Sequence, residues 1–394
     1  MPTAEQRHEV RIVLHDGTAL VNWPEVDITI DMLSPGSPWT ISLWHSETGD
    51  AAWKSVRRRA LLEMSVQVFI DGALQLTGRI DGAEVNASKE GGAVYTISGR
   101  DVGARAIDWD ADPTIALRGV TLEAALERLF GDVGLVPQIT DAARAREIQS
   151  SPHRVRGTRT TRRTNRVSDL KIQAGERIWG VAEKLCGRLG YMLWIAPGTS
   201  PDHVGVVVDV PNEGTEVPYL FERRATATGF AGNVLKSKRK LSSQNVPTHV
   251  TAFARSSLRG ERDENSRVAV VNEHLRSPEY VSPEAPLGLP PKPRYIKPER
   301  ARTEEAAQRE CEKVIAKANA GLEFYELTVR GFGQEGKLYA VNSLARVRDD
   351  LELPAVDGVY LLTRVTFHQS RQRGQVSDLR LVPKGAIKVY PESA

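Results

Sequence analysis

A run of three strands near the C-terminus constrains the fold more than any other feature of the sequence. In Leu344–Val382 a short strand-like stretch is followed by a loop with Asp-Asp and Pro, and a turn at Asp357-Gly358 opens a long strand, Val359–His368. A polar turn that contains glycine then leads into a last strand, Val376–Val382. Apolar and polar side chains alternate along these strands, which predicts antiparallel pairing with one buried face. The apolar positions are Leu362, Val365, Phe367, Val376, Leu379 and Leu381.

The same order of strands and turns occurs near the N-terminus. In Met64–Arg100 a strand meets a turn at Asp71-Gly72, a long strand follows, and a Glu-Gly-Gly turn leads into the last strand. Alternating apolar residues in Val10–Leu14, Val26–Ile30 and Trp39–Trp44 add short strands before this unit. Two copies of one β-unit at opposite ends of the chain predict two related β-domains, the first spanning residues 1–105.

Between the two β-units the apolar spacing becomes helical. A first helix is expected after Thr121, a candidate N-cap, with Gly131 or Gly134 at its end. A second helix is expected over Gly175–Leu189. The strands expected after it are Tyr191–Ile195 and, beyond a Pro-Gly turn, Val204–Val210. These elements predict a small, mixed α/β domain over residues 106–219.

The second β-domain is expected to be discontinuous. Strands at Asn233–Lys240 and His249–Ala254 are separated from Phe324–Arg330 by a charged, Pro-rich arm over 256–299 and by a helix, Glu304–Ala320. The arm is predicted to be extended and to lie outside a core. We therefore expect the second β-domain at 220–255 and 321–385, the inserted arm and helix at 256–320, and a C-terminal tail at 386–394.

Composition limits the class of protein. The 394 residues are enough for roughly two to four domains. Because 53 basic residues face 50 acidic ones, the chain has no overall field for nucleic acid or membrane binding. Cys186 and Cys311 lie in helix-like stretches, which suits a reducing cytoplasm. The N-terminus is too polar for a signal peptide, and no apolar run reaches the roughly 18 residues of a membrane span, so we expect a soluble protein.

Two motifs suggest chemistry by their letters, and in both the structural interpretation is favoured. GFGQEG at Gly331–Gly336 matches a dinucleotide fingerprint, but a strand-like stretch follows where a helix is needed, so a hairpin or loop is expected. Asp108, Asp110 and Asp112 could hold Ca²⁺ or Mg²⁺, but neither a tight-turn glycine nor a distal glutamate completes a loop, so a solvated linker is expected. No catalytic, cofactor or metal site is predicted, and we expect that the chain is not an enzyme.

An arginine cluster in the polar segment 151–169 is the sharpest electrostatic feature. One interpretation is a loop that orders on an acidic protein partner or on a neighbouring subunit. The other is a plain solvated loop. Nucleic acid is the least favoured partner because no aromatic residues are interleaved for stacking, and sequence-specific recognition is not expected. The candidate partner-binding residues are Arg154, Arg156, Arg159, Arg162, Arg163 and Arg166.

Taken together, these stretches resemble the baseplate hub proteins of contractile phage tails, of the Mu-type tail protein P and T4-type hub kind. VQVFIDGALQLTGRIDGAEV and YTISGRDVGARAIDWD are similar to the family's first tube-like β-domain and its exit. TLEAALERLFGDVGL and AGERIWGVAEKLCGRLGYMLWIAPG are similar to its helices, and GVYLLTRVTFHQSRQRGQVSDLRLVP to its closing hairpin. The resemblance covers most of the chain, although the Pro-rich arm has no counterpart.

The resemblance implies an α+β fold with two tail-tube-like antiparallel β-barrel or sandwich domains, a small α/β middle domain and an inserted arm. It also implies a homotrimer in the virion baseplate, assembled in the host cytoplasm. Three chains with two similar β-units each would give a pseudo-hexameric ring that adapts the six-fold tail tube to the three-fold spike and leaves a channel for DNA. The implied partners are further copies of the chain and the tail tube, central spike, baseplate wedge and tape-measure proteins.

A second class of function stays open. Trp39, Trp44 and Trp53 could stack on sugars, which would suit a glycan-binding or hydrolytic β-protein that acts on the cell envelope. Packing in a core is the other fate of such aromatic side chains. Peptidoglycan degradation or glycan retention by the isolated chain would favour this second hypothesis.

Overall fold

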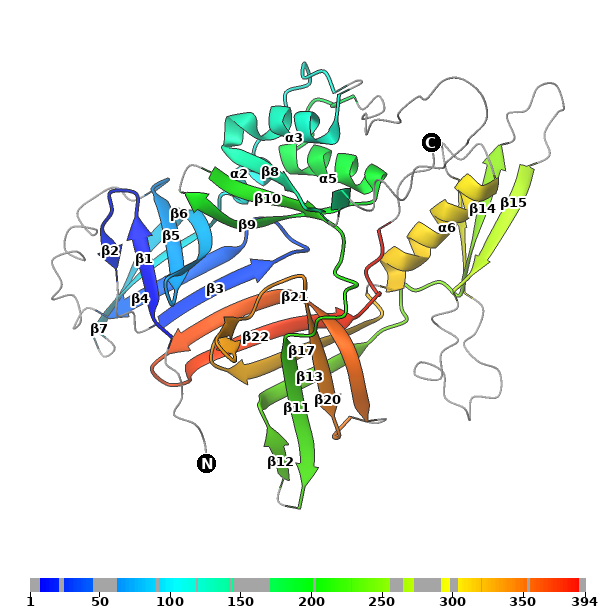
Figure 1. Ribbon diagram of the computed structural model, residues 1–394. Coiled ribbons are helices and arrows are strands. Elements are labelled where there is room, and N and C mark those ends of the chain that lie inside the picture. The colour runs from blue at the N-terminus through cyan, green and yellow to red at the C-terminus, as the bar shows by residue number, and fades with distance from the viewer. Residues whose placement is uncertain are drawn as a thin grey trace.

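Antiparallel sheets make up most of the protein, and helices are few (Figure 1). The predicted α+β fold class is therefore confirmed. The structure is a computed structural model. It describes residues 8–20, 25–44, 62–89, 92–117, 120–141, 143–144, 171–200, 203–227, 229–255, 265–272, 292–297, 304–319, 321–352 and 355–389.

The first β-unit contains the strands predicted from alternation. Asp71 and Gly72 have φ angles of 50° and 78°, and they form the predicted tight turn between β5 and β6. Trp39 of β4 is only 2% exposed and belongs to the core of this unit. Its strands are β1 (Val10–Leu14), β2 (Ala19–Leu20), β3 (Glu25–Asp31), β4 (Pro38–Trp44), β5 (Ser65–Ile70), β6 (Ala73–Ser88) and β7 (Gly92–Asp101).

The second β-unit confirms the three antiparallel strands expected near the C-terminus. Every apolar side chain predicted for the inner face is buried. The predicted turn at Asp357-Gly358 is wrong, because β21 already begins at Val356 and Asp357 forms an ion pair of 2.7 Å with Arg346 on β20. The strands are β11 (Tyr219–Thr226), β12 (Gly229–Gly232), β13 (Val234–Leu241), β17 (Glu323–Arg330), β18 (Gly333–Gln334), β19 (Lys337–Leu338), β20 (Ser343–Asp349), β21 (Val356–Ser370) and β22 (Gly374–Pro383).

The two β-units are continuous with each other. β3 of the first unit pairs antiparallel with β21 of the second, so one 14-stranded sheet passes through both (Figure 1). Their inner faces contribute to a single buried cluster. The two predicted β-domains are thus two β-units of one sheet. They meet edge to edge where β3 pairs with β21, and we call this joint the seam.

The middle region is the small mixed α/β unit that was expected. Thr121 caps α3 by accepting a hydrogen bond from the backbone N–H of Ala124 at 3.3 Å. α5 begins at Ile178, later than predicted, because Gly175 has a left-handed φ of 83° that a helix does not allow. β9 runs through the residues expected to form a Pro-Gly turn, Pro197 and Gly198. The elements are α2 (Gly103–Asp108), α3 (Leu122–Phe130), η2 (Gly131–Val133), β8 (Leu135–Ile139), α5 (Ile178–Leu189), β9 (Met192–Ser200) and β10 (His203–Asp209).

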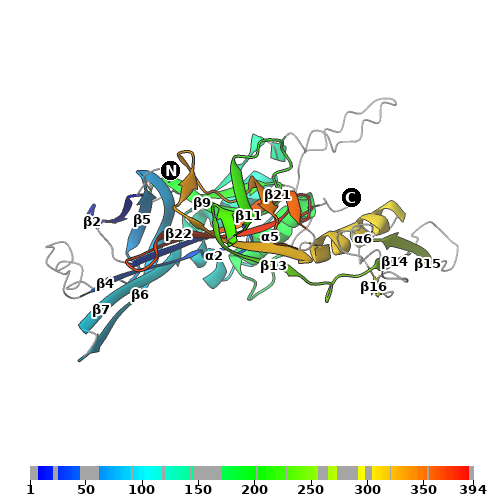
Figure 2. The same ribbon diagram turned by 90° about the horizontal axis from the view of Figure 1, so that it is seen from below.

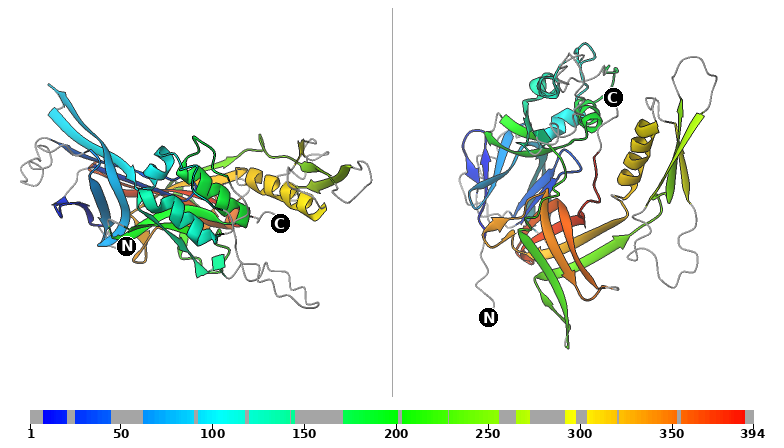
Figure 3. Two further views of the ribbon diagram at one scale, coloured as in Figure 1. Left: turned by 90° about the horizontal axis from the view of Figure 1, so that it is seen from above. Right: turned by 45° about the vertical axis from the view of Figure 1, so that its right-hand side comes forward.

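A separate small unit stands beside the large sheet (Figure 3). We expected His249–Ala254 to join the second β-unit, but β14 (His249–Arg255) pairs with β15 (Asn265–Val271) and β16 (Pro293–Ile296). The reason is that Val250 and Ala252 are buried against α6 (Glu304–Asn319) and not against the large core. The predicted extended arm therefore contains two strands. The domain boundaries themselves stay a prediction.

No helix within the described ranges is long and apolar enough to cross a membrane.

Candidate assembly interface

The seam between the β-units has an apolar face and a charged face. Ile28 of β3 lies opposite Phe367 of β21, and both side chains are fully buried in the core. On the other face, Arg364 Nη2 lies 2.6 Å from Asp31 Oδ2, and Asp31 is only 7% exposed. Asp31 is buried while the Arg364 side chain is 41% exposed, so loss of Arg364 would leave a buried carboxylate without its partner, and the pair favours this register of the seam.

His368 links three strands on the charged face. Its Nδ1 contacts the carboxylate of Asp27 on β3, and its Nε2 lies 3.0 Å from Asp378 Oδ2 on β22. Hydrogen bonds to Asp27 and Asp378 raise the pKa of His368 to about 9. Thr328 Oγ1 also donates to Asp378, at 2.5 Å. The imidazole is therefore positively charged at neutral pH, and it acts as an electrostatic bridge rather than as a base.

The N-terminal segment holds the two units together a second time. The His8 backbone N–H donates to Gln375 Oε1 of the second unit at 2.7 Å. The His8 ring pairs with Asp71 in the turn of the first unit at 2.5 Å and stacks on Phe332 at 5.2 Å. These contacts and the seam leave little freedom for one β-unit to rotate against the other.

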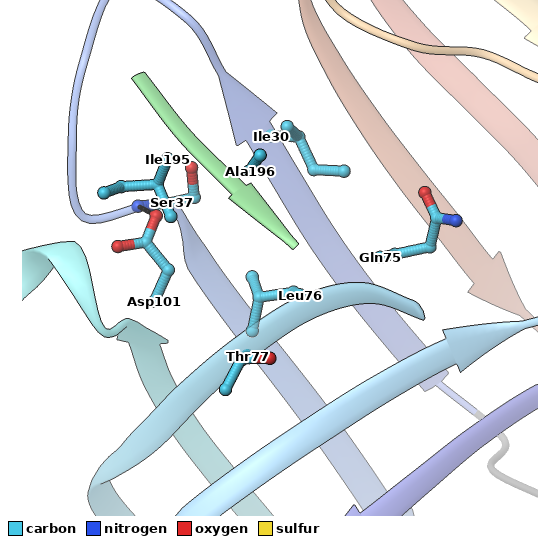
Figure 4. A pocket seen from close by; sticks show the side chains of 8 residues that line it. All are labelled: Ile30, Ser37, Gln75, Leu76, Thr77, Asp101, Ile195 and Ala196. Atoms are coloured by element: carbon cyan, nitrogen blue, oxygen red, sulfur yellow. Dashed lines mark hydrogen bonds between the residues drawn. The ribbon is translucent and has the colours of Figure 1, made fainter. Parts of the chain in front are cut away.

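A small pocket lies where the first β-unit meets the middle unit (Figure 4). Asp101 lines it from the end of β7, and its Oδ2 accepts the Ser37 backbone N–H at 2.7 Å. Burial raises the pKa of Asp101 to about 6. Asp101 Oδ1 and Thr77 Oγ1 have no hydrogen-bond partner among the described residues. The carboxylate and the Ser37 and Thr77 hydroxyls beside it lie at the junction of the two units, and we assign them no chemistry.

Two stretches of strand in the large sheet, one in each β-unit, have a bare edge that matters for assembly. β13 pairs with β17 on one side and with no described strand on the other. β6 loses β5 beyond Arg79, so its last part, Gly82–Ser88, pairs only with β7 and projects as a hairpin (Figure 2). Unpaired backbone N–H and C=O groups along such edges can add a further strand. Val85 and Leu241, on these two edges, are 54% and 48% exposed.

The residues singled out from sequence have different outcomes. The six arginines at positions 154, 156, 159, 162, 163 and 166 lie outside the described residues, so their role stays a prediction. Gly331–Gly336 enters the β18–β19 hairpin, as the favoured interpretation required. Asp108 pairs with Arg100 and Asp110 with Arg177, each at 2.8 Å. Within the described ranges no three acidic, His or Cys side chains are grouped to hold a metal ion.

Sequence reasoning missed the seam and the His8 contacts. A signal for the seam was present, because acidic side chains alternate along β3 at Asp27 and Asp31 and basic ones along β21 at Arg364 and His368. Nothing in the sequence showed that these two strands are partners.

The fold and its edges define a class of protein. The class is that of β-rich chains with two related units joined in one sheet, and bare strand edges on both units can pair with further strands.

Comparisons with known proteins agree with this class. Residues 9–101 match the family described as Mu phage baseplate assembly protein GpP-like, N-terminal. The chain is similar to the tail protein from Neisseria meningitidis MC58, with a TM-score of 0.72 at 19% identity over 98% of this chain and 100% of that chain. It is also similar to the prophage MuSo2 43 kDa tail protein from Shewanella oneidensis, with a TM-score of 0.71 at 16% identity over 96% and 99% of the two chains.

The E. coli c3393 protein is a more distant structural neighbour. It is a component of the type VI secretion system with structural similarity to the T4 bacteriophage tail proteins gp27 and gp5. Its TM-score is 0.51 at 11% identity over 96% of this chain and 79% of that chain. No curated protein matches the sequence. The resemblance predicted from sequence is thus confirmed: the chain has the fold of hub-type phage tail proteins, and its first β-unit also matches in sequence.

Proposed function

We propose that the chain is the structural hub of a contractile-tail baseplate, a homotrimer whose six β-units form a pseudo-hexameric ring. The observation that carries this proposal is the repeat of one β-unit within the chain. β5, β6 and β7 of the first unit correspond to β20, β21 and β22 of the second in order and direction.

The correspondence extends to the register of the strands. The long strand shifts register between Ile80 and Gly82 in the first unit and between Leu362 and Arg364 in the second. The hairpin that follows closes with Ser88 opposite Gly92 in one unit and Ser370 opposite Gly374 in the other.

An unusual backbone conformation is repeated as well. Glu63 and Asn342 both have a left-handed φ, at 64° and 60°. Each donates its backbone N–H at 2.9 Å to the residue before the shift, Glu63 to Ile80 and Asn342 to Leu362. A chain with two such units needs only three copies to supply six, which supports a three-fold ring with six similar parts.

In this proposal the ring adapts the six-fold tail tube to the three-fold central spike and leaves a channel for DNA. Its partners are further copies of the chain and the tube, spike, wedge and tape-measure proteins. Its location is the virion baseplate, after assembly in the host cytoplasm. The similarity in fold to a tail protein and a prophage tail protein, and to c3393 with its own similarity to gp27 and gp5, supports this assignment.

We assign no reaction to the chain. The glycan hypothesis depended on exposed tryptophans, and Trp39 is buried in the core. The side chain of Trp44 and all of Trp53 lie outside what the structure describes. Retention of the chain on peptidoglycan would revive that hypothesis.

The mass of the purified protein tests the proposal. We expect three times the chain mass of 43.4 kDa by light scattering, either for the chain alone or once the spike protein is added. A stable dimer that binds neither tube nor spike protein would contradict the proposal.

A further inference from the structure

The internal repeat also relates strands of the two β-units whose outer edges differ: the edge is paired in one unit and bare in the other. In the first unit β3 pairs with β4, which pairs with β7. In the second unit β13 pairs with β17, which pairs with β22. Because β7 and β22 correspond, β13 stands in the second unit where β3 stands in the first. By the same register, Gly82–Ser88 of β6 corresponds to Arg364–Ser370 of β21.

Within one chain only one of the two equivalent joints is made. The outer edge of β3 pairs with β21 over Arg364–Gln369, which forms the seam. No described strand pairs with the outer edge of β13 or with that of Gly82–Ala87 in β6, and these two edges are the counterparts of the edges joined at the seam. One chain therefore contains one complete joint, the seam, and the two separate strand edges from which a second joint of the same kind could form.

We propose, on the basis of the hub function proposed above, that β13 of one copy pairs antiparallel with Gly82–Ser88 of the next copy in the register of the seam. The seam's residue pairs can be carried over to the equivalent positions. Thr29 opposite Thr366 then becomes Lys240 opposite Glu84, and Asp27 opposite His368 becomes Lys238 opposite Asn86. The occupant of each bare edge is thus a second copy of this chain.

The charges favour this pairing. Lys236, Lys238 and Lys240 alternate along β13, and Glu84 is an exposed acid on the β6 edge. Opposite charges directly across a pair of strands stabilise it, and like charges destabilise it.

The charges also oppose the wrong pairing. At the seam the acids lie on β3 and the bases on β21, which is the reverse of the proposed joint. If β13 took the place of β3 at the seam, its lysines would lie near Arg364 and His368. If β3 paired with β6, Asp27 and Asp31 would lie near Glu84. The reversed polarity thus distinguishes the joint within a chain from the joint between chains.

The other face of the proposed joint carries apolar side chains beside a buried ion pair, because Arg239, the counterpart of Ile28, lies opposite Val85 in this register and is bound to Glu323 at 2.9 Å. Val85 corresponds to Phe367, which the seam buries fully, and Leu241 corresponds to Ile30, which packs on the same core. Val85 and Leu241 are exposed apolar residues on the two bare edges, and pairing between copies would cover both.

A cysteine pair tests the register. At the seam Met32 N–H donates to the Thr363 carbonyl at 3.0 Å, so Asp27 and His368 form a non-hydrogen-bonded pair, whose Cα atoms lie about 4.5 Å apart. A disulfide spans that distance. We expect Asn86→Cys with Lys238→Cys to give covalently linked trimers on oxidation of the full chain, and the native Cys186 and Cys311 are buried.

The matched control moves one cysteine two residues out of register, as Asn86→Cys with Lys240→Cys, and should not cross-link. If the chain is trimeric by mass but the in-register pair stays unlinked, or only the control pair links, this joint is wrong and the hub proposal stands. If no trimer forms with or without spike protein, both are overturned.

Charge reversal gives an independent test. Glu84→Lys places a lysine opposite Lys240, and we expect the association of the copies to weaken about tenfold per joint. Adding Lys240→Glu restores an opposite-charge pair and should restore trimer formation. Glu183→Lys, on the exposed face of α5, is the control and should leave the trimer unchanged. Equal trimer formation by the wild type and Glu84→Lys would overturn the pairing.

Discussion

His368 is the side chain on which the charged face of the seam most depends. Replacement of His368 by Gln keeps polar contacts but removes the positive charge between Asp27 and Asp378. We expect the free energy of unfolding to fall by about 1–2 kcal/mol at neutral pH. This is less than the full pKa shift would give, because the site is partly exposed to solvent.

The pH dependence of this effect has a definite sign. The folded pKa of about 9 lies above the ordinary 6.5, so the contribution is complete below the ordinary pKa and is lost as pH rises through 9. The stability difference between wild type and His368→Gln should therefore vanish by about pH 10. Urea unfolding of both proteins across this pH range measures it, and a difference that does not change with pH would contradict the bridge.

Asp101 makes the opposite kind of contribution at neutral pH. Burial raises its pKa from 3.8 to about 6, so stability falls as pH rises from about 4, and the loss is complete above about pH 6. We expect wild type to lose about 1.4 kcal/mol per pH unit relative to Asp101→Asn between about pH 4 and 6. Unfolding curves of the two proteins at several pH values provide the measurement. Parallel pH profiles would mean that folding does not raise the pKa of Asp101.

Residue-level features differ in how far the sequence predicts them. Thr121 acts on its own helix, so the local pattern was sufficient to predict its role as N-cap. His8, by contrast, acts on Asp71 and Gln375, far along the chain. Contacts of this kind depend on how the strands pair, which no local pattern encodes.

At the scale of elements, Gly99 allows β7 to pass beneath Trp39. A Cβ atom at Gly99 would lie 1.8 Å from the Arg79 carbonyl oxygen and 2.7 Å from the Trp39 ring. We expect Gly99→Ala to lower the free energy of unfolding by at least about 3 kcal/mol, since neither backbone nor buried ring can move aside.

Gly187 on α5 provides the matched control. A Cβ atom there meets nothing within 4 Å, so Gly187→Ala should stabilise the helix by about 0.5–1 kcal/mol. Thermal or urea unfolding distinguishes the two variants. A mild effect of Gly99→Ala would show that β6, β7 and Trp39 are packed more loosely than described.

Strands were predictable as segments but not as partners. Alternation located Val376–Val382 and Asn233–Lys240 within a residue or two of β22 and β13. It misassigned Asp357-Gly358 because Asp-Gly favours turns, whereas both residues pair with β20, opposite Arg348 and Val347. It also assigned His249–Ala254 to the wrong sheet, because a period of two identifies a strand and not its neighbours.

For the whole molecule, the repeat of β-units and the joint between them matter most. The repeat was visible in sequence from Met64–Arg100 and Leu344–Val382. The joint was not, because β3 and β21 are separated by most of the chain. His8, Asp31 and His368 then fix the angle between the units. A subunit with a fixed angle and complementary bare edges is suited to forming a closed ring.

Electron microscopy of the assembled protein tests the ring most directly. We predict a particle with three-fold symmetry in which six similar β-units surround a central opening, with strand pairing continuous through alternate joints of two kinds. A two-fold particle, or a three-fold particle in which only one β-unit of each chain borders the opening, would contradict the account.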